Sequence, residues 1–299
     1  MALLWIVLFV PVLIVRLAFL RFRQERRSQI RFIRTRLATV EKSSDLRRVV
    51  ASLSTLPDRI GNLGPTIRCL LAQTRAPDEI VVAVPDVSAR QQKAYAIPEY
   101  LATFPRVRVL RCAKDWGPAT KFIPIIQEEL AAGRDGTLIM VVDDDRTYPR
   151  DALETYLSYN RELPDAVLCF RGGTIIRKSG HYGLRISRGS LMRMPKSIAA
   201  ITGCGSYLIQ PRFFDSTLWD YSGAPPGAFY MDDIWISGWL ERHGVEKFIV
   251  PTSAMMRTAR DQFGTMTLGD VPSGRKRTNH ELIKYFQTKY GIFRVPELC

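Results

Sequence analysis

The sequence has few cysteines, and their arrangement forms no recognisable scaffold. The five residues are odd in number and scattered, and no pair has the short spacing typical of a zinc site. Most of them lie in apolar runs that indicate core positions. A disulfide framework and a structural zinc site are therefore excluded, and a reducing compartment such as the cytoplasm is favoured.

Internal repeats and low-complexity segments are also missing. The chain has 299 residues, of which 46% are apolar, enough to bury one large domain or two small ones. Repeat architectures and extended disorder are therefore excluded. We expect one α/β domain with appendages at its two ends.

Acidic residues are scarce relative to basic ones, and the imbalance is uneven along the chain. There are 29 acidic and 43 basic residues, a net charge of +14, which by itself would permit nucleic acid, anionic membranes or phosphorylated substrates as partners. Between Arg16 and Arg36 eight arginines face one acid, Glu25. We interpret residues 21–46 as a basic juxtamembrane segment on anionic headgroups and predict no nucleic-acid partner.

The N-terminal apolar segment, residues 1–20, has no basic region before it and no small-residue cleavage site after it, which disfavours a cleaved signal peptide. Its 14 uninterrupted apolar residues run from Ala2 to Val15. At about 1.5 Å per residue, a 20-residue helix just crosses a hydrocarbon core of about 30 Å. We predict a single-pass anchor in an inner or cell membrane, with a surface-lying helix as the alternative. The arginines that follow place the rest of the chain in the cytoplasm.

Residues 47–260 alternate between strand-like and helix-like patterns. Short β-branched runs are separated by segments with apolar residues at three- and four-residue spacing, which predicts a largely parallel sheet flanked by helices. The predicted strands are "VVASLST", "EIVVAV", "VRVLRC", "TLIMVV" and "AVLCF", and the predicted helices between them are "LGPTIRCLLAQ", "PATKFIPIIQEEL" and "RDALETYLSYN".

Three acids, Asp143, Asp144 and Asp145, follow the buried strand "LIMVV" at once. Ligands of open α/β sheets bind beyond the carboxyl ends of strands. Asp143 and Asp145 lie two residues apart, so both can face one ligand while Asp144 turns aside. Clustered carboxylates repel one another without a cation, and oxygen ligands select a hard ion such as Mg²⁺ or Mn²⁺. An acidic turn that only caps the next helix remains the alternative.

A divalent ion with few protein ligands usually completes its shell with substrate phosphates, so the ligand is expected to be a nucleoside diphosphate. Candidate donor contacts follow the first and third strands: Thr55 and Arg59 in "LSTLPDRIG", and Asp115 and Lys121 in "KDWGPATKF". Asp115 could accept bonds from a base or ribose, and Lys121 could balance a phosphate. An ordinary turn is the alternative explanation for each.

The stretch "FYMDDIWISGWLERHG" contains the four letters YMDD that reverse transcriptases carry in a catalytic hairpin. Trp235 and Trp239 lie four residues apart, and Gly244 has the position of a helix C-cap, so the stretch predicts a helix and not a strand. A polymerase palm is therefore excluded. Asp232 and Asp233 arrive at the helix N-terminus, as catalytic acids or as a helix cap.

The remaining residues, 261–299, are polar and then close with a helix, "ELIKYFQTKYG". We interpret "SGRKRTNHE" as a basic flexible loop in which His280 is a candidate additional metal ligand, or as a plain surface charge run. Gly203 and Gly205 are candidates for lining an acceptor pocket, and a strand-entry turn explains them equally well.

Four motifs in this order resemble inverting glycosyltransferases of the GT-A fold, those similar to family 2: "SLSTLPDRI", "DWGPATK", "VVDDD" and "DDIWISGW". The resemblance covers roughly residues 48–250. It implies a Rossmann-like domain, a nucleotide-sugar donor, a divalent cation, and an acceptor that is a glycan or lipid-linked. Asp143, Asp144 and Asp145 become donor and metal ligands, with the choice of metal ligands open, and Asp233 becomes the catalytic base beside Asp232.

Two departures from the family pattern narrow this interpretation. Asp232 stands where the family usually has Glu, and no clear Q-x-x-R-W motif is present, which argues against a processive synthase. The alternatives are a non-catalytic nucleotide-binding membrane scaffold of the same fold and a nucleotidyltransferase. The nucleotidyltransferase reading lacks the Gly-rich N-terminal loop with its Arg and Lys.

Overall fold

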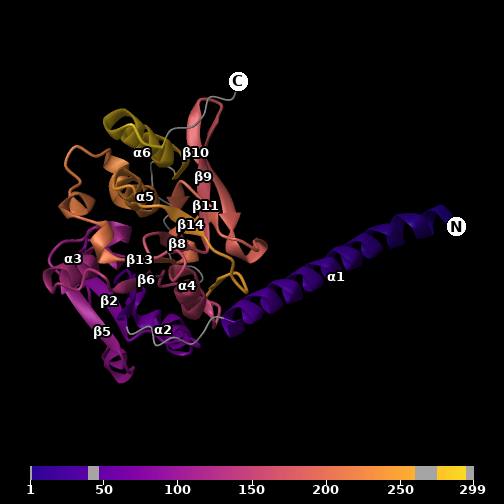
Figure 1. Cartoon of the computed structure of the whole chain (residues 1–299), viewed down its shortest axis with the longest axis horizontal. Helices are drawn as coiled ribbons and strands as arrows, with labels where there is room; N and C mark the ends of the chain where they lie inside the picture. Colours follow the sequence, from indigo (N-terminus) through magenta and orange to yellow (C-terminus); the bar gives the residue numbers. More distant parts are fainter. Residues whose placement is uncertain (1, 40–46, 260–274, 294–299) are drawn as a thin grey trace.

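The computed structural model describes residues 2–39, 47–259 and 275–293, without the side chains of residues 2–13 and 275–276. Within these residues, an α/β domain carries one long helix, α1 (Ala2–Thr39), which projects away from it (Figure 1).

The central sheet of the domain has eight strands in the order β11-β14-β8-β13-β6-β1-β2-β5. β1 pairs in parallel with β2 and β6, β2 with β5, and β8 with β14, whereas β13 runs antiparallel between β6 and β8. The predicted, largely parallel sheet is confirmed, and all five predicted strands are present. The strands are β1 (Val49–Ser54), β2 (Glu79–Pro85), β5 (Val107–Cys112), β6 (Leu138–Val141), β8 (Val167–Cys169), β11 (Lys196–Ser197), β13 (Tyr207–Ile209) and β14 (Lys247–Ile249).

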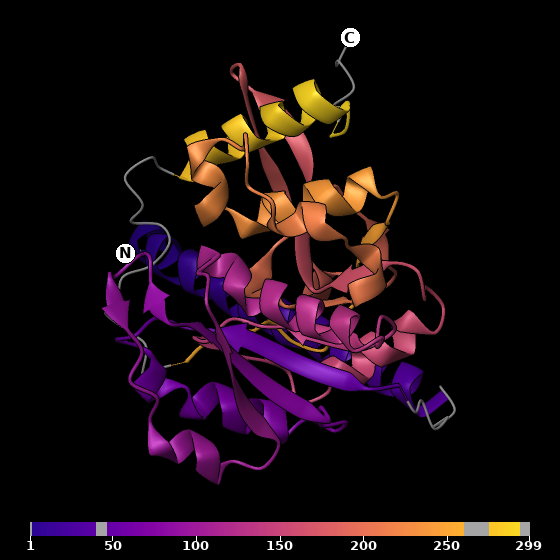
Figure 2. The same ribbon diagram turned by 90° about the vertical axis from the view of Figure 1, so that its left-hand side faces the viewer.

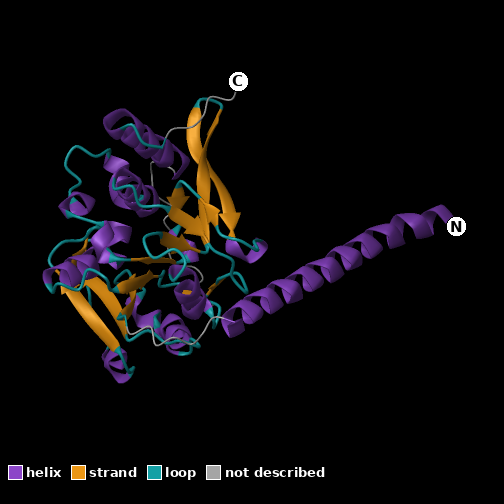
Figure 3. Cartoon of the chain, viewed as in Figure 1, coloured by secondary structure: helices purple, strands orange, loops and turns teal. Residues whose placement is uncertain are grey.

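Smaller sheets lie outside the central one, and Figure 3 shows the long hairpin of the largest of them standing to one side of the domain. A three-stranded sheet has the order β10-β9-β12, and two-stranded ladders join β15 to β7 and β3 to β4. Their bounds are β3 (Val87–Ser88), β4 (Lys93–Ala94), β7 (Arg146–Thr147), β9 (Arg171–Lys178), β10 (His181–Arg188), β12 (Ala200–Ile201) and β15 (Arg257–Thr258).

Alternate residues of the central strands point to opposite faces of the sheet, and each face has its own core. Val50 of β1 joins the core under one group of helices, whereas Val49 and Ala51 join the core on the other side. One face is covered by α2 (Gly64–Leu71) and α4 (Ala152–Asn160); the other is covered by α3 (Ile123–Ala131), α5 (Asp232–Arg242) and α6 (Arg275–Tyr290). Figure 2 shows α6 and α2 at opposite ends of the domain.

Short 3₁₀ helices form many of the connections. They are η1 (Ile60–Asn62), η2 (Glu99–Thr103), η3 (Gly117–Lys121), η4 (Gly189–Leu191), η5 (Gly203–Gly205), η6 (Pro211–Phe213), η7 (Ser216–Trp219) and η8 (Pro226–Tyr230).

The predicted helix after YMDD is α5, and it is buried. Trp235 is fully buried and its indole N–H donates to the Leu218 carbonyl at 2.7 Å. A Cβ on Gly238 would lie 2.4 Å from the Phe286 ring, so the glycine lets α6 pack directly on α5. Gly244 ends the helix at φ +70°, as expected of a C-cap.

The loop predicted at 273–281 is wrong from residue 275 onward, because α6 begins there. Thr278, Leu282 and Phe286 recur every four residues, and all three are buried on one helix face. The polar composition of the segment concealed this spacing. Residues 260–274, which precede α6, lie outside the described residues.

The C-terminal half of α1 packs against the domain. Gln29 and Ile33 are buried, and the Gln29 amide donates to the carbonyls of Met192 at 2.7 Å and Thr252 at 3.2 Å. Arg36 pairs with Glu162 at 2.6 Å and stacks over the Tyr159 ring, 3.6 Å from its centroid. The segment predicted as a juxtamembrane tether therefore has an exposed part before Ser28 and a docked part after it, while residues 40–46 lie outside the described residues.

Before the docked part, α1 is exposed. Leu17, Phe19 and Phe22 each expose more than half of their side chains. Across the part of the chain that the structure describes, no helix is long and apolar enough to cross a membrane. Most of the apolar run that predicted an anchor, residues 2–13, lies outside the described side chains.

Two truncations test the docking of α1. Deleting residues 1–27 should leave the melting temperature close to that of the full chain, because no described contact with the domain is lost. Deleting residues 1–46 removes the burial of Ile33, worth about 1.5–3 kcal/mol, together with the bonds of Gln29 and Arg36. Thermal denaturation should then show a midpoint several degrees lower, at about 2–4 °C per kcal/mol for a domain of this size. Equal midpoints would show that the docked half contributes nothing.

Candidate active site

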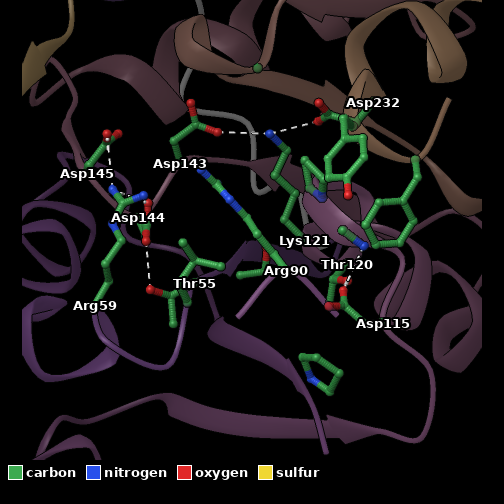
Figure 4. Close-up of a pocket in the computed structure, with 18 of the residues that line it drawn as sticks. Thr55, Arg59, Arg90, Asp115, Thr120, Lys121, Asp143, Asp144, Asp145 and Asp232 are labelled. Atoms are coloured by element: carbon green, nitrogen blue, oxygen red, sulfur yellow. Dashed lines mark hydrogen bonds and ion pairs between the residues drawn. The ribbon is translucent and has the colours of Figure 1, made fainter. Parts of the chain in front are cut away.

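One cavity of about 360 Å³ collects nearly all the predicted site residues. It opens where β1, β5 and β6 end, and the N-terminus of α5 closes its far side (Figure 4). The predicted residues that line it are Thr55, Arg59, Asp115, Lys121, Asp143, Asp144, Asp145, Asp232 and Asp233.

The ammonium group of Lys121 lies between the two groups of acids. Its Nζ is 2.9 Å from Asp143 Oδ1 and 2.9 Å from Asp232 Oδ2. Burial by itself lowers the pKa of Lys121, but Asp143 and Asp232 raise it well above its ordinary value, so the group stays charged. For Asp143 the directions are opposite. Burial raises the pKa of its carboxyl group, but the positive charge of Lys121, with those of Arg146 and Arg59, holds that pKa below its ordinary value.

The three consecutive aspartates have different partners. Asp144 is the most buried; it accepts a bond from the Thr55 hydroxyl at 2.7 Å and pairs with Arg59 at 3.0 Å. Asp145 pairs with Arg59 at 3.2 Å and Arg146 at 3.3 Å. The side chains of Asp143 and Asp145 keep a quarter of their surface exposed, whereas that of Asp144 keeps 9%.

Burial raises the pKa of Asp144 to about 6, although Arg59 and the Thr55 hydroxyl oppose the rise. The neighbouring charges of Asp145 and Asp143 raise it further. Asp144 is thus the acid of this cluster that costs most to keep ionised, and Asp143 and Asp145 are the two that present carboxylate to the cavity.

Asp115 fixes the loop between β5 and η3. Its carboxylate accepts bonds from the backbone N–H groups of Gly117 and Ala89, both at 2.7 Å, and from the Thr120 hydroxyl at 3.1 Å. Gly117 has φ +60°, and a Cβ there would lie 2.6 Å from the Phe229 carbonyl oxygen. These contacts shape the rim of the cavity, and Asp115 remains a predicted donor contact.

Asp232 and Asp233 occupy the first turn of α5 and point to different partners. Asp232 faces Lys121, whereas Asp233 Oδ1 accepts a bond from the Gly203 backbone N–H at 2.7 Å. A Cβ on Gly203 would lie 2.6 Å from Lys121 Nζ, so only glycine fits there without displacing the lysine. Gly203, a candidate from the sequence, thus lies in the cavity wall.

The structure does not bring His280 to these acids. It lies on α6, where its Nδ1 accepts a bond from the Tyr182 backbone N–H at 3.0 Å and its ring stacks on Tyr182. Its position was not predictable, because the sequence alone does not show where α6 docks. We leave His280 out of the proposed metal site.

Some residues at the cavity or directly behind it carried no signal in the sequence. Tyr95 lines the cavity and donates to the Thr55 carbonyl at 2.8 Å, and Tyr148, outside the lining, accepts a bond from the Asp143 backbone N–H at 2.8 Å. Arg90 reaches the cavity from the connection between β3 and β4. All three lie in segments with no recognisable motif, and tertiary contacts alone place them.

The oxygen donors suit a hard cation that is only partly held by protein. Among the described side chains, no group of three His, Cys, Asp or Glu converges as a metal cluster. Asp143 and Asp145 are two partly exposed carboxylates on one cavity, and Mg²⁺ or Mn²⁺ is usually held by one or two carboxylates together with substrate phosphates. The residues present therefore fit such an ion in the company of a diphosphate.

The family follows from a direct comparison. The sequence model of the protein family described as "Glycosyl transferase family 2" matches residues 58–219, more than half of the chain. The chain belongs to glycosyl transferase family 2. The resemblance that the motifs indicated is confirmed, and the matched range includes the acids after β6. It ends before Asp232, so it does not cover the acids of α5.

Among solved structures, the crystal structure of 4-diphosphocytidyl-2C-methyl-D-erythritol synthase is similar to this family 2 chain. The TM-score is 0.44 at 16% sequence identity, covering 73% of this chain and 96% of that one. A comparison with curated proteins finds no match.

Replacing Lys121 by methionine tests the charge cluster. Removing one partner of a buried ion pair costs about 3–5 kcal/mol, and here the buried Asp232 and the partly exposed Asp143 would lose the cation that they share. Denaturant unfolding at about pH 8 should show this loss. The matched control is Lys93→Met, an exposed lysine paired with Asp58, which should change stability by less than about 1 kcal/mol.

The same variant should depend on pH in a defined direction. Lys121 holds the pKa of Asp143 below its ordinary value, so without the lysine this pKa should rise, and the folded variant should bind more protons as the pH falls and regain stability. The parent instead loses stability as the pH falls. The lowered pKa of Asp143 contributes stability at neutral pH, and this contribution is lost as the pH falls through that pKa. The difference in unfolding free energy between the parent and Lys121→Met should therefore be smaller at about pH 5 than at about pH 8. A deficit that does not change with pH would show that the cost is one of packing and not of charge.

Proposed function

We propose that this family 2 glycosyltransferase moves a sugar, with inversion at the anomeric carbon, from a nucleotide-sugar donor to a hydroxyl group of a glycan or lipid-linked acceptor. One observation carries the proposal: two groups of carboxylates line opposite sides of a single cavity, and Lys121 bridges them. A displacement at carbon needs one group to support the leaving diphosphate and another to activate the nucleophile.

The donor side is the cluster after β6. Thr55 and Arg59 hold Asp144, and Asp143 and Asp145 present carboxylate to the cavity. These two would hold the divalent cation, Mn²⁺ or Mg²⁺, which when bound supplies positive charge to the departing diphosphate. Arg59 and Lys121 are cations on the same wall and can contact phosphate oxygens directly.

The acceptor side is the first turn of α5. Asp233 takes the proton of the acceptor hydroxyl, the hydroxyl oxygen forms a bond to the anomeric carbon, and the bond from that carbon to the diphosphate oxygen breaks with its electrons on the diphosphate. Asp232 is expected to bind acceptor hydroxyls or to hold Lys121. The backbone bond from Gly203 keeps one oxygen of Asp233 fixed at the cavity wall.

The proposal includes association of the N-terminal segment with a membrane, with the catalytic domain in the cytoplasm. It is supported by the apolar run from Ala2 to Val15, by the arginines that follow, and by the apolar side chains that α1 exposes before its docked part.

Asp145→Asn tests the metal assignment. The change keeps the shape of the side chain and removes one charge, so the affinity for UDP or GDP in Mn²⁺ should fall about tenfold or more, the scale of a lost charge-assisted interaction. Calorimetric titration with Mn²⁺ and with a chelator separates the metal-dependent part. Asp165→Asn, at an exposed carboxylate outside the cavity, is the control. Unchanged nucleotide affinity in Asp145→Asn would refute the assignment.

Asp233→Asn and Asp232→Asn, measured side by side, test the base. Asp233→Asn should leave nucleotide binding nearly intact and reduce sugar transfer by on the order of 10²-fold or more, the usual scale for a positioned base. Asp232→Asn should be milder, since that side chain faces Lys121.

Two results of this comparison would count against the assignment. Full turnover in Asp233→Asn would show that Asp232 and Asp233 only cap the helix α5 and take no part in proton transfer. Equal loss of nucleotide binding in both variants would mean that both acids hold the metal. Donor hydrolysis without acceptor, which needs no knowledge of the acceptor, separates an enzyme from a non-catalytic nucleotide-binding scaffold.

A further inference from the structure

A second cavity of about 210 Å³ adjoins the first and shares Arg146 and Cys204 with it. We name it the arginine pocket. Three arginines line it, and no aspartate or glutamate does so among the described residues; its apolar wall comes from Phe170, Met255 and Met256. The donor cavity, in contrast, is rich in carboxylates.

The hydrogen-bond partners of the pocket arginines are mostly uncharged hydroxyl and thiol groups. Arg171 donates to the Thr202 hydroxyl at 3.0 Å and to Cys204 Sγ at 2.9 Å, and Arg146 donates to the Thr258 hydroxyl at 2.6 Å while pairing with Asp145. Arg188 is exposed and forms no ion pair with any described acid. Clustered guanidinium groups repel one another, and their planar forks match the oxygens of a phosphate group. The pocket is therefore built for an anion.

An unsatisfied polar atom in the same pocket also indicates a ligand. The hydroxyl of Ser190 is buried and has no hydrogen-bond partner within the described residues. Buried polar atoms normally have a partner, because leaving one unmade costs about 1–3 kcal/mol. Because Ser190 lines the pocket, rotation of its hydroxyl toward a phosphate oxygen there would supply the missing partner.

The wall between the two cavities is the turn η5. Gly203 of this turn donates to Asp233, Cys204 lines both cavities, and a Cβ on Gly205 would lie 2.5 Å from Arg171 Cβ. The turn is therefore packed between the proposed base and the arginine pocket. Because Cys204 and Arg146 line both cavities, a molecule with an anion in the arginine pocket would lie next to the cavity that contains Asp233.

The other side of the pocket adjoins α1 and an apolar surface. Gln29 of α1 donates to the carbonyl of Thr252, a residue of the pocket wall. Met255 at the pocket and Leu191 and Met194 in the adjacent loop expose more than half of their side chains. Exposed apolar side chains beside a basic pocket fit a ligand that carries an apolar chain.

We propose that the arginine pocket binds the phosphate group of a lipid-linked acceptor, whose hydroxyl then reaches Asp233. This deepens the proposed function and rests on it. The phosphate is bound and not altered: the proton and the new bond are those of the hydroxyl transfer described above.

The test is binding of octyl phosphate to the full chain, compared with octanol and inorganic phosphate, by calorimetric titration. Octyl phosphate should bind at least tenfold more tightly than either, because it alone supplies both the anion and the apolar chain. Arg188→Gln should weaken it about tenfold, the scale of one charge-assisted contact. Arg171→Gln should do the same, and Arg185→Gln, an exposed arginine of β10 that does not line the pocket, should change nothing.

Several results would overturn the proposal. Equal octyl phosphate affinity in Arg188→Gln and Arg185→Gln would remove the pocket from the binding site. Inorganic phosphate binding as tightly as octyl phosphate would exclude a lipid, and octanol binding as tightly would exclude the phosphate contact. Displacement by UDP or GDP would place the ligand in the donor cavity. Nucleotide affinity should be equal in the parent, Arg188→Gln and Arg185→Gln, and a parent chain that binds no nucleotide would count against the proposed function and not against the pocket.

Discussion

The buried ammonium of Lys121 holds the two halves of the active site together. Asp143 follows a central strand and Asp232 begins a helix much later in the chain, yet both carboxylates meet the same nitrogen at 2.9 Å. Two carboxylates so close to one nitrogen would repel each other without it. With it, Asp143, Asp232 and Lys121 together carry one net negative charge, which suits the divalent cation and the acceptor proton of the proposed reaction.

The same constraint determines the backbone around the lysine. Gly203 must lack a side chain because Lys121 occupies the space a Cβ would need, and its N–H then reaches Asp233. The turn η5 is thus held by a charge on one side and by Arg171 on the other. Direct contacts therefore connect the donor side of the cavity to the wall of the arginine pocket.

The predictable parts of this site are those set by local sequence. The buried strand before Asp143 and the four-residue spacing of Trp235 and Trp239 identify their elements without tertiary information. Strand β13, three residues long, is too short to show a period, and its antiparallel insertion between β6 and β8 depends on pairing with distant segments. The position of His280 depends on tertiary packing for a related reason. The buried face of α6 has few apolar residues in a largely polar segment, so the sequence does not show how this helix docks.

In α1, the composition and the structure give different information. Arginines dominate the segment and suggest a solvated tether, but Gln29, Ile33 and Arg36 recur at helical spacing and form a docked face. Because α1 is one continuous helix, these contacts set the direction in which its N-terminal half leaves the domain (Figure 1). Gln29 also donates to the carbonyl of Thr252 in the wall of the arginine pocket, so the same contacts fix the direction of α1 relative to that pocket.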